Sequence, residues 1–265
     1  MKCNYPKFME QFTKDQQLME LMKEQSFETA FQPILSLQKD ETLGFEVLNR
    51  PLSTALFPST EQFYDYAGKS SHVFMIEGFL RNLSLQRYAK QLDQNQSFQK
   101  ELIFINIQPQ VLADPLYRSG TTLDLLNQYG LTPEQIVLEL TEKEAVTDYV
   151  QFEKVIANYR RQGFRIAVDD AGTGYNSLKT IISLKPEFIK LDKSIVRDIH
   201  KHAAQQHLIE ILLEFAAHSQ TDVIAEGIEN FSEMDFLKKL GVQFGQGYAL
   251  GRPAAHLDKG MIPVN

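Results

Sequence analysis

The sequence predicts an α/β protein, a modified (β/α)8 TIM-like barrel whose first strand is antiparallel to the others, preceded by an N-terminal helix. Eight short apolar runs of strand length mostly alternate with segments of helical periodicity. Only residues 38 to 42 separate the first two runs, too few for a parallel crossover, so these two strands should pair as a hairpin. The 265 residues suit a single barrel domain. An open doubly wound sheet is the alternative that periodicity leaves open.

The first predicted element is a helix over residues 8 to 25, where apolar side chains recur at roughly helical spacing: Phe8, Phe12, Leu18, Leu21 and Met22. We expect this apolar face to pack on the main domain; the alternative is contact with a partner or a second copy. The predicted organisation is therefore an N-terminal helical extension, residues 1–26, and a barrel domain, residues 27–265.

The barrel elements follow in order. Strands are expected at 30–37 and 43–48, helices at 60–68 and 74–91, a strand at 102–107, a helix at 121–128, a strand at 136–141 and a helix at 148–162. A strand over 166–168 then leads to a helix that carries Leu178, Ile181, Ile182 and Leu184 on one face, and to a strand over 188–191. A long helix over 194–217, a strand over 222–226, a helix over 230–240 and a strand over 243–248 complete the chain.

Polar side chains interrupt these apolar strands at or near their carboxyl ends, where barrel enzymes carry their chemistry: Glu46, Asn106, Glu139, Asp169, Asp170, Lys190, Asp192, Glu226 and Gln246. Burying several carboxylates together is costly unless they are compensated, and Lys190 and Arg50 are too few. One or two hard divalent cations would compensate them. Oxygen ligands favour magnesium, manganese or calcium, and none of the six histidines lies at a predicted strand end.

Composition limits the remaining possibilities. Two hard cations are the usual device for in-line attack on a phosphodiester, and a neighbouring lysine or arginine can hold water or phosphate. The net charge of -7 disfavours binding of polymeric nucleic acid. Cys3 is the only cysteine, so there is neither an internal disulfide nor a thiolate zinc cluster. Without a signal-peptide pattern or a membrane-length apolar run, we expect a cytoplasmic protein.

Eight short motifs in order resemble those of the EAL-domain family of cyclic-di-GMP phosphodiesterases. They are FQPI at 31–34, FEVLNRP at 45–51, NIQPQVL at 106–112, LELTE at 138–142, DDAGTGYNSL at 169–178, LKPEFIKLD at 184–192, AEGIE at 225–229 and QGYALGRP at 246–253. Any one of these motifs is weak evidence, whereas eight in the family's order are highly specific.

The resemblance implies a modified (β/α)8 barrel that hydrolyses one phosphodiester bond of cyclic-di-GMP to linear pGpG with Mg²⁺ or Mn²⁺, two per site. The implied metal ligands are Glu46, Asn106, Glu139, Asp169 and Asp170. The implied catalytic residues are Lys190, Glu46, Glu226 and Asp170, with Gln32, Arg50 and Gln246 binding substrate and Glu142, Asp192 and Glu229 in support. Family members often form homodimers near the double-aspartate loop, which implies the same possibility here.

The chain departs from the family motifs at Val47, Asn49, Gln108 and Ala171. Ala171 replaces a phenylalanine of the double-aspartate loop, which could loosen the second metal site. Every charged motif residue is present, so we favour an active enzyme over a catalytically silent cyclic-di-GMP receptor or a barrel acting on another phosphodiester. A purely structural interpretation of Lys190 is that it neutralises Asp192, two positions away on the same strand.

Overall fold

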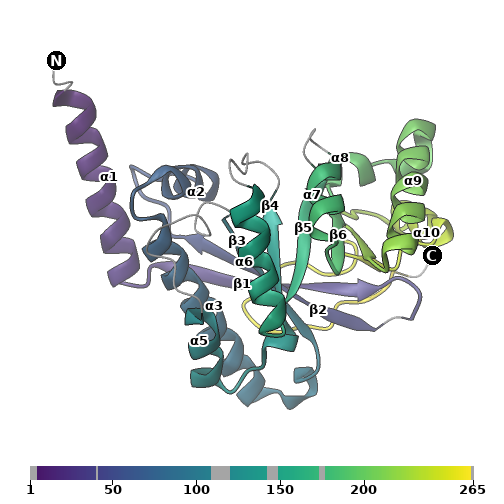
Figure 1. Cartoon of the computed structure of the whole chain (residues 1–265), viewed down its shortest axis with the longest axis horizontal. Helices are drawn as coiled ribbons and strands as arrows, with labels where there is room; N and C mark the ends of the chain where they lie inside the picture. The colour runs from purple at the N-terminus through teal and green to yellow at the C-terminus, as the bar shows by residue number, and fades with distance from the viewer. Residues whose placement is uncertain (1–4, 40, 109–119, 142–148, 173–176, 264–265) are drawn as a thin grey trace.

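The computed structural model describes residues 5–39, 41–108, 120–141, 149–172 and 177–263, and its eight strands form a closed barrel in the order β1 to β8 (Figure 1). β1 (Phe27–Ser36) is antiparallel to β2 (Thr42–Pro51) and to β8 (Phe244–Gly245), and all other neighbours are parallel. The predicted reversed first strand is confirmed, and the open-sheet alternative is wrong.

The other strands and the helices that cover them lie close to the predicted ranges. The strands are β3 (Leu102–Ile107), β4 (Ile136–Thr141), β5 (Arg165–Ala171), β6 (Phe188–Leu191) and β7 (Asp222–Ala225). The helices are α1 (Tyr5–Lys23), α2 (Thr60–Lys69), α3 (Val73–Gln94), α5 (Thr121–Tyr129), α6 (Tyr149–Arg161), α7 (Ser177–Leu184), α8 (Lys193–Val196), α9 (Ala203–Ser219) and α10 (Phe231–Leu240), with short 3-10 turns at Gln96–Phe98, Pro133–Gln135 and Ile199–Lys201. Among the described residues, no helix is both long enough and apolar enough to cross a membrane.

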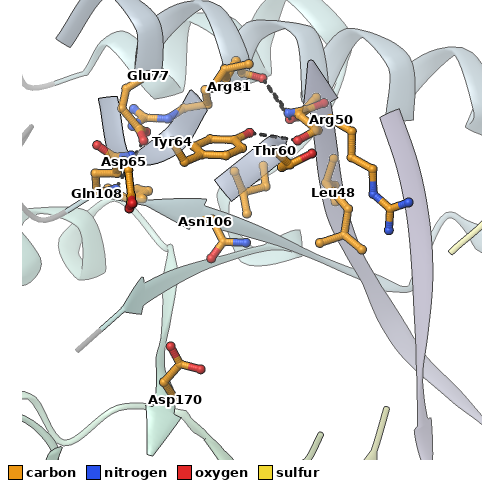
Figure 2. Close-up of a pocket in the computed structure, with 16 residues that line it drawn as sticks. Leu48, Arg50, Thr60, Tyr64, Asp65, Glu77, Arg81, Asn106, Gln108 and Asp170 are labelled. Carbon is orange, nitrogen blue, oxygen red and sulfur yellow. Dashed lines mark hydrogen bonds and ion pairs between the residues drawn. The ribbon is translucent and has the colours of Figure 1, made fainter. Parts of the chain in front are cut away.

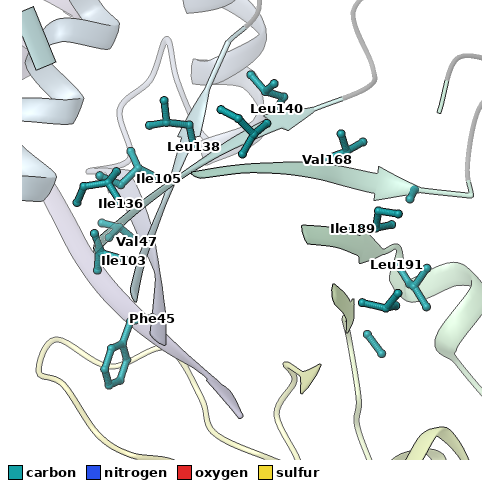
Figure 3. Packing of buried hydrophobic residues seen from close by; sticks show 14 of the residues in the cluster. Phe45, Val47, Ile103, Ile105, Ile136, Leu138, Leu140, Val168, Ile189 and Leu191 are labelled. Carbon is teal, nitrogen blue, oxygen red and sulfur yellow. The ribbon is translucent and has the colours of Figure 1, made fainter. Parts of the chain in front are cut away.

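Two apolar layers hold the barrel together because alternate strand residues point to opposite faces. Residues such as Ile103, Ile105 and Leu138 point outward and pack beneath the surrounding helices (Figure 3). A smaller cluster fills the barrel interior: Ile34, Leu102, Phe104, Val137, Ala167, Phe188 and Ile224. The Phe104 and Phe188 rings lie 5.4 Å apart, so the interior is a packed plug rather than a channel.

The N-terminal helix α1 is only half packed. Leu18 and Leu21 are buried in a cluster with Phe27 and Phe63, as the sequence predicts. Phe8 and Phe12 are 62% and 48% exposed, so the prediction that the whole apolar face packs on the main domain is wrong. The first turns of α1 extend beyond the barrel (Figure 1), where no described element covers their apolar side chains.

Three further predictions need correction. The long helix expected over 194–217 is divided into α8, a 3-10 turn and α9 because Asp198 adopts a φ of +53° and donates its N–H to Glu233 Oε1. β8 covers only two residues of the expected 243–248, although the Gln246 N–H still donates to the Ala225 carbonyl. Ile182 does not share the buried face of Ile181, because it is 59% exposed.

Candidate active site

The polar residues of the site occupy the interior positions immediately above the apolar plug. Interior residues recur every second position, and on five strands a plug residue is followed two positions later by a polar one. The steps are Phe104 to Asn106, Val137 to Glu139, Ala167 to Asp169, Phe188 to Lys190 and Ile224 to Glu226. Parallel pairing places Asn106 beside Glu139 in register. Asp169 and Glu226 lie two positions beyond Ala167 and Ile224, the residues paired with Glu139 and Lys190. The barrel therefore carries its polar cluster at the carboxyl end of the strands.

Lys190 is the centre of this cluster and is completely buried. Its Nζ lies 2.6 Å from Glu139 Oε1 and 2.6 Å from Glu226 Oε1, and 3.4 Å from Glu46 Oε2 and 3.6 Å from Asp169 Oδ1. One ammonium group thus faces four carboxylates, whereas no ion pair with Asp192 occurs among the described residues. The interpretation that Lys190 merely neutralises Asp192 is wrong.

A β-bulge brings the second aspartate to the same site. Strict alternation would turn Asp170 away from the barrel interior, but the register of β5 against β6 shifts between Val168 and Ala171. Asp170 itself has a φ of +55°, a left-handed conformation that is uncommon for a residue with a side chain. As a result, carboxylate oxygens of Asp169, Asp170 and Glu226 lie within 4.8 Å of one another.

Burial dominates the electrostatics of these acids. It raises the pKa of Glu139 well above its usual range and raises the pKa of Asp169, and the attraction of Lys190 offsets only part of either shift. The pKa of Glu226 is raised to about 8 by burial, again against the attraction of Lys190. Burial by itself would lower the pKa of Lys190, but the four carboxylates raise it well above its usual value. The lysine therefore remains charged, whereas the acids favour the protonated form unless a further cation compensates them.

The donor set fits hard divalent cations. Glu139 Oε2 is buried and has no hydrogen-bond partner among the described residues, and Glu139 Oε1 contacts Lys190 as an ion pair over 2.6 Å. A buried carboxylate oxygen without a donor is costly unless a cation compensates it. All candidate ligands present oxygen, and the Asp169, Asp170 and Glu226 group is compact enough to hold a metal ion. Glu46 and Glu139 adjoin that group through their ion pairs with Lys190. Asn106 adjoins Glu46, because its Nδ2 donates to Glu46 Oε1 over 3.2 Å.

Two of the three predicted substrate-binding residues, Gln246 and Gln32, adjoin Glu46. Gln246 Nε2 donates to Glu46 Oε2 over 2.7 Å, while Gln246 Oε1 is buried and finds no hydrogen-bond partner within the described ranges. Gln32 is paired with Glu46 across β1 and β2, and its side chain donates to the Gly251 carbonyl. Arg50 is exposed at the end of β2.

Among the described residues, neither Asp192 nor Glu229 forms an ion pair with Lys190. Asp192 caps α8 by accepting from the Ser194 N–H. Glu229 makes an exposed ion pair of 3.3 Å with Arg197. Glu142 lies outside the described residues, as does most of the loop after Ala171. Ala171 itself is fully buried in β5, and its carbonyl accepts from the Asp192 N–H.

A pocket adjoins the cluster between the ends of β2 and β3 and the helices α2 and α3. It encloses about 360 Å³ and reaches Asn106 and Asp170 at the edge of the acid cluster. Figure 2 shows Tyr64, Glu77, Arg81 and Gln108 gathered on one side of Asn106, with Asp170 on the other. Its walls also include apolar side chains: Val47, Leu48, Leu80, Ile105 and Ile107.

The sequence analysis missed Glu77 and Arg81 of this pocket. Both are buried on α3, four residues apart, with Glu77 Oε2 3.7 Å from Arg81 Nη2. Burial raises the pKa of Glu77 to about 7, and the attraction of Arg81 offsets only part of the shift. Two charged residues beside Ile76 and Leu80 on the apolar face of a predicted helix were the available signal.

A family model described as "EAL domain" matches residues 15–253. The chain belongs to the EAL family. The matched span contains every residue of the lysine-centred cluster and the whole of the pocket. Among curated EAL relatives, "Probable cyclic di-GMP phosphodiesterase PdeB" of Escherichia coli K12 is 31% identical over 219 residues, which cover 82% of this chain and 41% of PdeB. The chain spans less than half the length of the curated relatives it matches.

Solved EAL structures share this fold at moderate sequence identity. The EAL enzyme Bd1971, in its form bound to cAMP and cyclic-di-GMP, has a TM-score of 0.83 and 28% identity, with 94% of this chain and 67% of that chain covered. BlrP1 of Klebsiella pneumoniae, as a calcium and cyclic-di-GMP complex, has a TM-score of 0.77 and 26% identity, with 90% and 59% covered. BlrP1 has also been solved as a manganese complex. Bd1971 and BlrP1 have thus both been solved with the dinucleotide, and BlrP1 also with a divalent metal.

Proposed function

We propose that the protein hydrolyses one phosphodiester bond of cyclic-di-GMP to give linear pGpG. The observation that carries the proposal is the buried Lys190 surrounded by four carboxylates at the carboxyl end of the barrel, beside a pocket open to Asp170. The relatives named as cyclic di-GMP phosphodiesterases and the neighbours solved with cyclic-di-GMP support this substrate.

The proposed metal ligands are Glu46, Asn106, Glu139, Asp169 and Asp170, with Glu226 close to the last two. When bound, two Mg²⁺ or Mn²⁺ ions would supply Lewis-acid activation of water and offset the charge of the phosphate. The geometry supports these cations because the cluster contains more carboxylates than its single lysine can compensate.

The chain's own groups perform the remaining steps. The Lys190 ammonium is a fixed donor that holds and orients the attacking water, because the ion pairs prevent it from moving. Water adds to phosphorus and the bond from phosphorus to the 3′ oxygen breaks. A carboxylate of the cluster accepts the proton of the attacking water, and the leaving 3′ oxygen takes up a proton from solvent water. Arg50 is exposed at the pocket rim, where its guanidinium can grip the phosphate oxygens. Gln246 fixes the orientation of Glu46 through its hydrogen bond.

The test is incubation of the purified protein with cyclic-di-GMP and Mg²⁺ or Mn²⁺, with chromatographic separation of the products. We expect pGpG from the wild type and none from Glu46→Ala, because this substitution removes a carboxylate that contacts both Lys190 and Asn106. Intact dinucleotide that remains bound to the wild type would instead identify a receptor. Absence of both binding and turnover would refute the proposal.

A homodimer is the assembly that we propose for this enzyme. Ile182 on α7, and Leu208 and Ile211 on α9, are exposed apolar side chains on helices that flank β6 in sequence. α7 also follows the strand that carries both aspartates, so contact there would couple assembly to the site. Light scattering should give twice the monomer mass, and a catalytically competent monomer would contradict the coupling.

A further inference from the structure

Arg81 is a buried cation with hydrogen-bonding capacity that the described part of the chain leaves unused. Its side chain is 7% exposed, and Nη1 donates to Thr122 Oγ1 over 2.7 Å. Among the described residues, Nε and Nη2 have no hydrogen-bond partner, and the nearest carboxylate, Glu77, lies 3.7 Å from Nη2. A buried donor left unsatisfied costs on the order of 1–3 kcal/mol. The guanidinium lines the pocket beside Asn106, so a ligand in that pocket could satisfy it.

The same pocket wall also presents acceptors. Glu77 Oε1 accepts from the Gln108 backbone N–H over 3.3 Å, and Gln108 Oε1 is buried without a hydrogen-bond partner in the described part of the chain. One cation and one anion therefore stand side by side, with an amide oxygen nearby (Figure 2). A ligand that suits this wall offers both donors and acceptors and carries no net charge.

A phosphate group does not meet that description, because the Glu77 carboxylate would repel it. The apolar side chains across the pocket, among them Leu48, Leu80 and Ile107, suit a flat aromatic ring instead. A purine base attached to a phosphate held at the acid cluster fits both requirements. Guanine carries acceptors at O6 and N7, and an arginine fork can donate to both atoms.

We propose that Arg81 is a specificity-determining residue that donates hydrogen bonds to the O6 and N7 edge of a guanine in this pocket. The inference rests on the proposed function, since it assigns a role within recognition of the same substrate. Adenine carries an amino donor where guanine carries O6, so the guanidinium would face a donor and reject it. Discrimination between the two bases thus depends on a residue outside the acid cluster.

The test is steady-state hydrolysis by Arg81→Met of cyclic-di-GMP, cyclic-di-AMP and a cyclic-di-GMP whose guanines are 7-deaza. For cyclic-di-GMP we expect the KM to rise about 10- to 100-fold with kcat within about twofold, the discrimination typical of a paired arginine contact. The preference for cyclic-di-GMP over cyclic-di-AMP should fall by the same factor. The 7-deaza substrate should raise the KM of the wild type but not that of the variant, because its missing N7 removes a contact that the variant already lacks.

Two controls separate recognition from structure. Arg87→Met removes another arginine of α3, whose Nη1 donates to the Phe27 carbonyl and Thr29 Oγ1 and which lies outside the pocket. Arg87→Met should leave the KM ratio of the two dinucleotides unchanged. If Arg81→Met is not folded, Arg81→Lys keeps the charge without the fork and should show the same loss of preference.

An unchanged KM ratio in folded Arg81→Met and Arg81→Lys would overturn the inference while the enzyme remained active on cyclic-di-GMP. An equal rise in KM for all three substrates would also overturn it, because it would indicate general damage to the pocket. A wild type that neither binds nor hydrolyses cyclic-di-GMP would instead refute the proposed function, so the two failures are distinguishable.

Discussion

The acid cluster and the neighbouring pocket both bury charge, but they balance it differently. Around Lys190, four carboxylates surround one ammonium, and a carboxylate oxygen is left without a donor. In the pocket, one carboxylate on α3 faces one guanidinium, beside apolar walls. The first region has an excess of negative charge, which favours cations, whereas the second has none. The two regions meet at Asn106 and Asp170, so one ligand can use both.

This comparison shows that the ratio of buried anions to buried cations indicates which kind of ligand each region can bind. A balanced buried pair can be retained for specificity, because it recognises a neutral ligand with donors and acceptors. An unbalanced cluster is unstable unless a cation or protons enter it. The three substitutions below alter the balance in each region and on the surface.

Lys190→Met should have the largest effect, because it removes the cation that faces four carboxylates of the acid cluster. Removing one partner of a buried ion pair costs about 3–5 kcal/mol, so the metal-free variant should be much less stable than the wild type. Turnover should fall by at least about 100-fold, the scale of losing a positioned catalytic group. Urea unfolding with and without Mg²⁺, together with product formation, measures both effects.

Lys193→Met, an exposed lysine three residues further on, is the matched control. Mg²⁺ should restore part of the stability of Lys190→Met because cations replace the missing charge. A variant that keeps wild-type turnover would contradict the assignment of Lys190 to the site.

Glu77→Gln tests the balanced pair through its pH dependence. Burial raises the pKa of Glu77 to about 7 from its ordinary value of 4.5, so the folded protein binds this proton more tightly than the unfolded chain. The stability associated with this group is therefore complete below pH 4.5 and is lost as the pH rises through about 7. Relative to Glu77→Gln, the wild type should lose about 3 kcal/mol between these limits.

Urea unfolding of both proteins at several pH values measures this difference, in which the acids of the Lys190 cluster cancel. The wild type and Glu77→Gln should show a constant difference above about pH 8, where the carboxyl of the wild type is ionised in both states. If the difference in unfolding free energy between the two proteins stayed constant from pH 4 to pH 8, burial would not control the pKa of Glu77.

Glu229→Gln should have the smallest effect, because its ion pair with Arg197 is exposed. The two side chains are 50% and 66% exposed, and an exposed pair contributes less than about 1 kcal/mol. A loss of unfolding free energy larger than about 1 kcal/mol would show that the acid cluster extends to Glu229. Lower turnover at unchanged stability would instead support the predicted supporting role of Glu229.

The sequence predicted which residues of each strand belong to the site, but it did not predict the contacts between residues of different elements. Polar residues at the ends of apolar strands identified Glu46, Asn106, Glu139, Asp169 and Lys190, because alternation along a strand is local information. The meeting of Glu77 with Gln108 was not predictable in this way, since it depends on how α3 packs against the end of β3.

By itself, the sequence determined the order of the strands, the reversed first strand, the polar strand ends and the family. These depend on residue spacing, loop length and motif order, all of which are written along the chain. Only the tertiary structure decided that the sheet closes, that Lys190 pairs with four carboxylates rather than Asp192, and that a bulge brings Asp170 beside Asp169. It also ended the long helix at Asp198 through a bond to Glu233 on α10. The physical reason is that these outcomes depend on contacts between residues far apart in sequence, whose energies no local pattern contains.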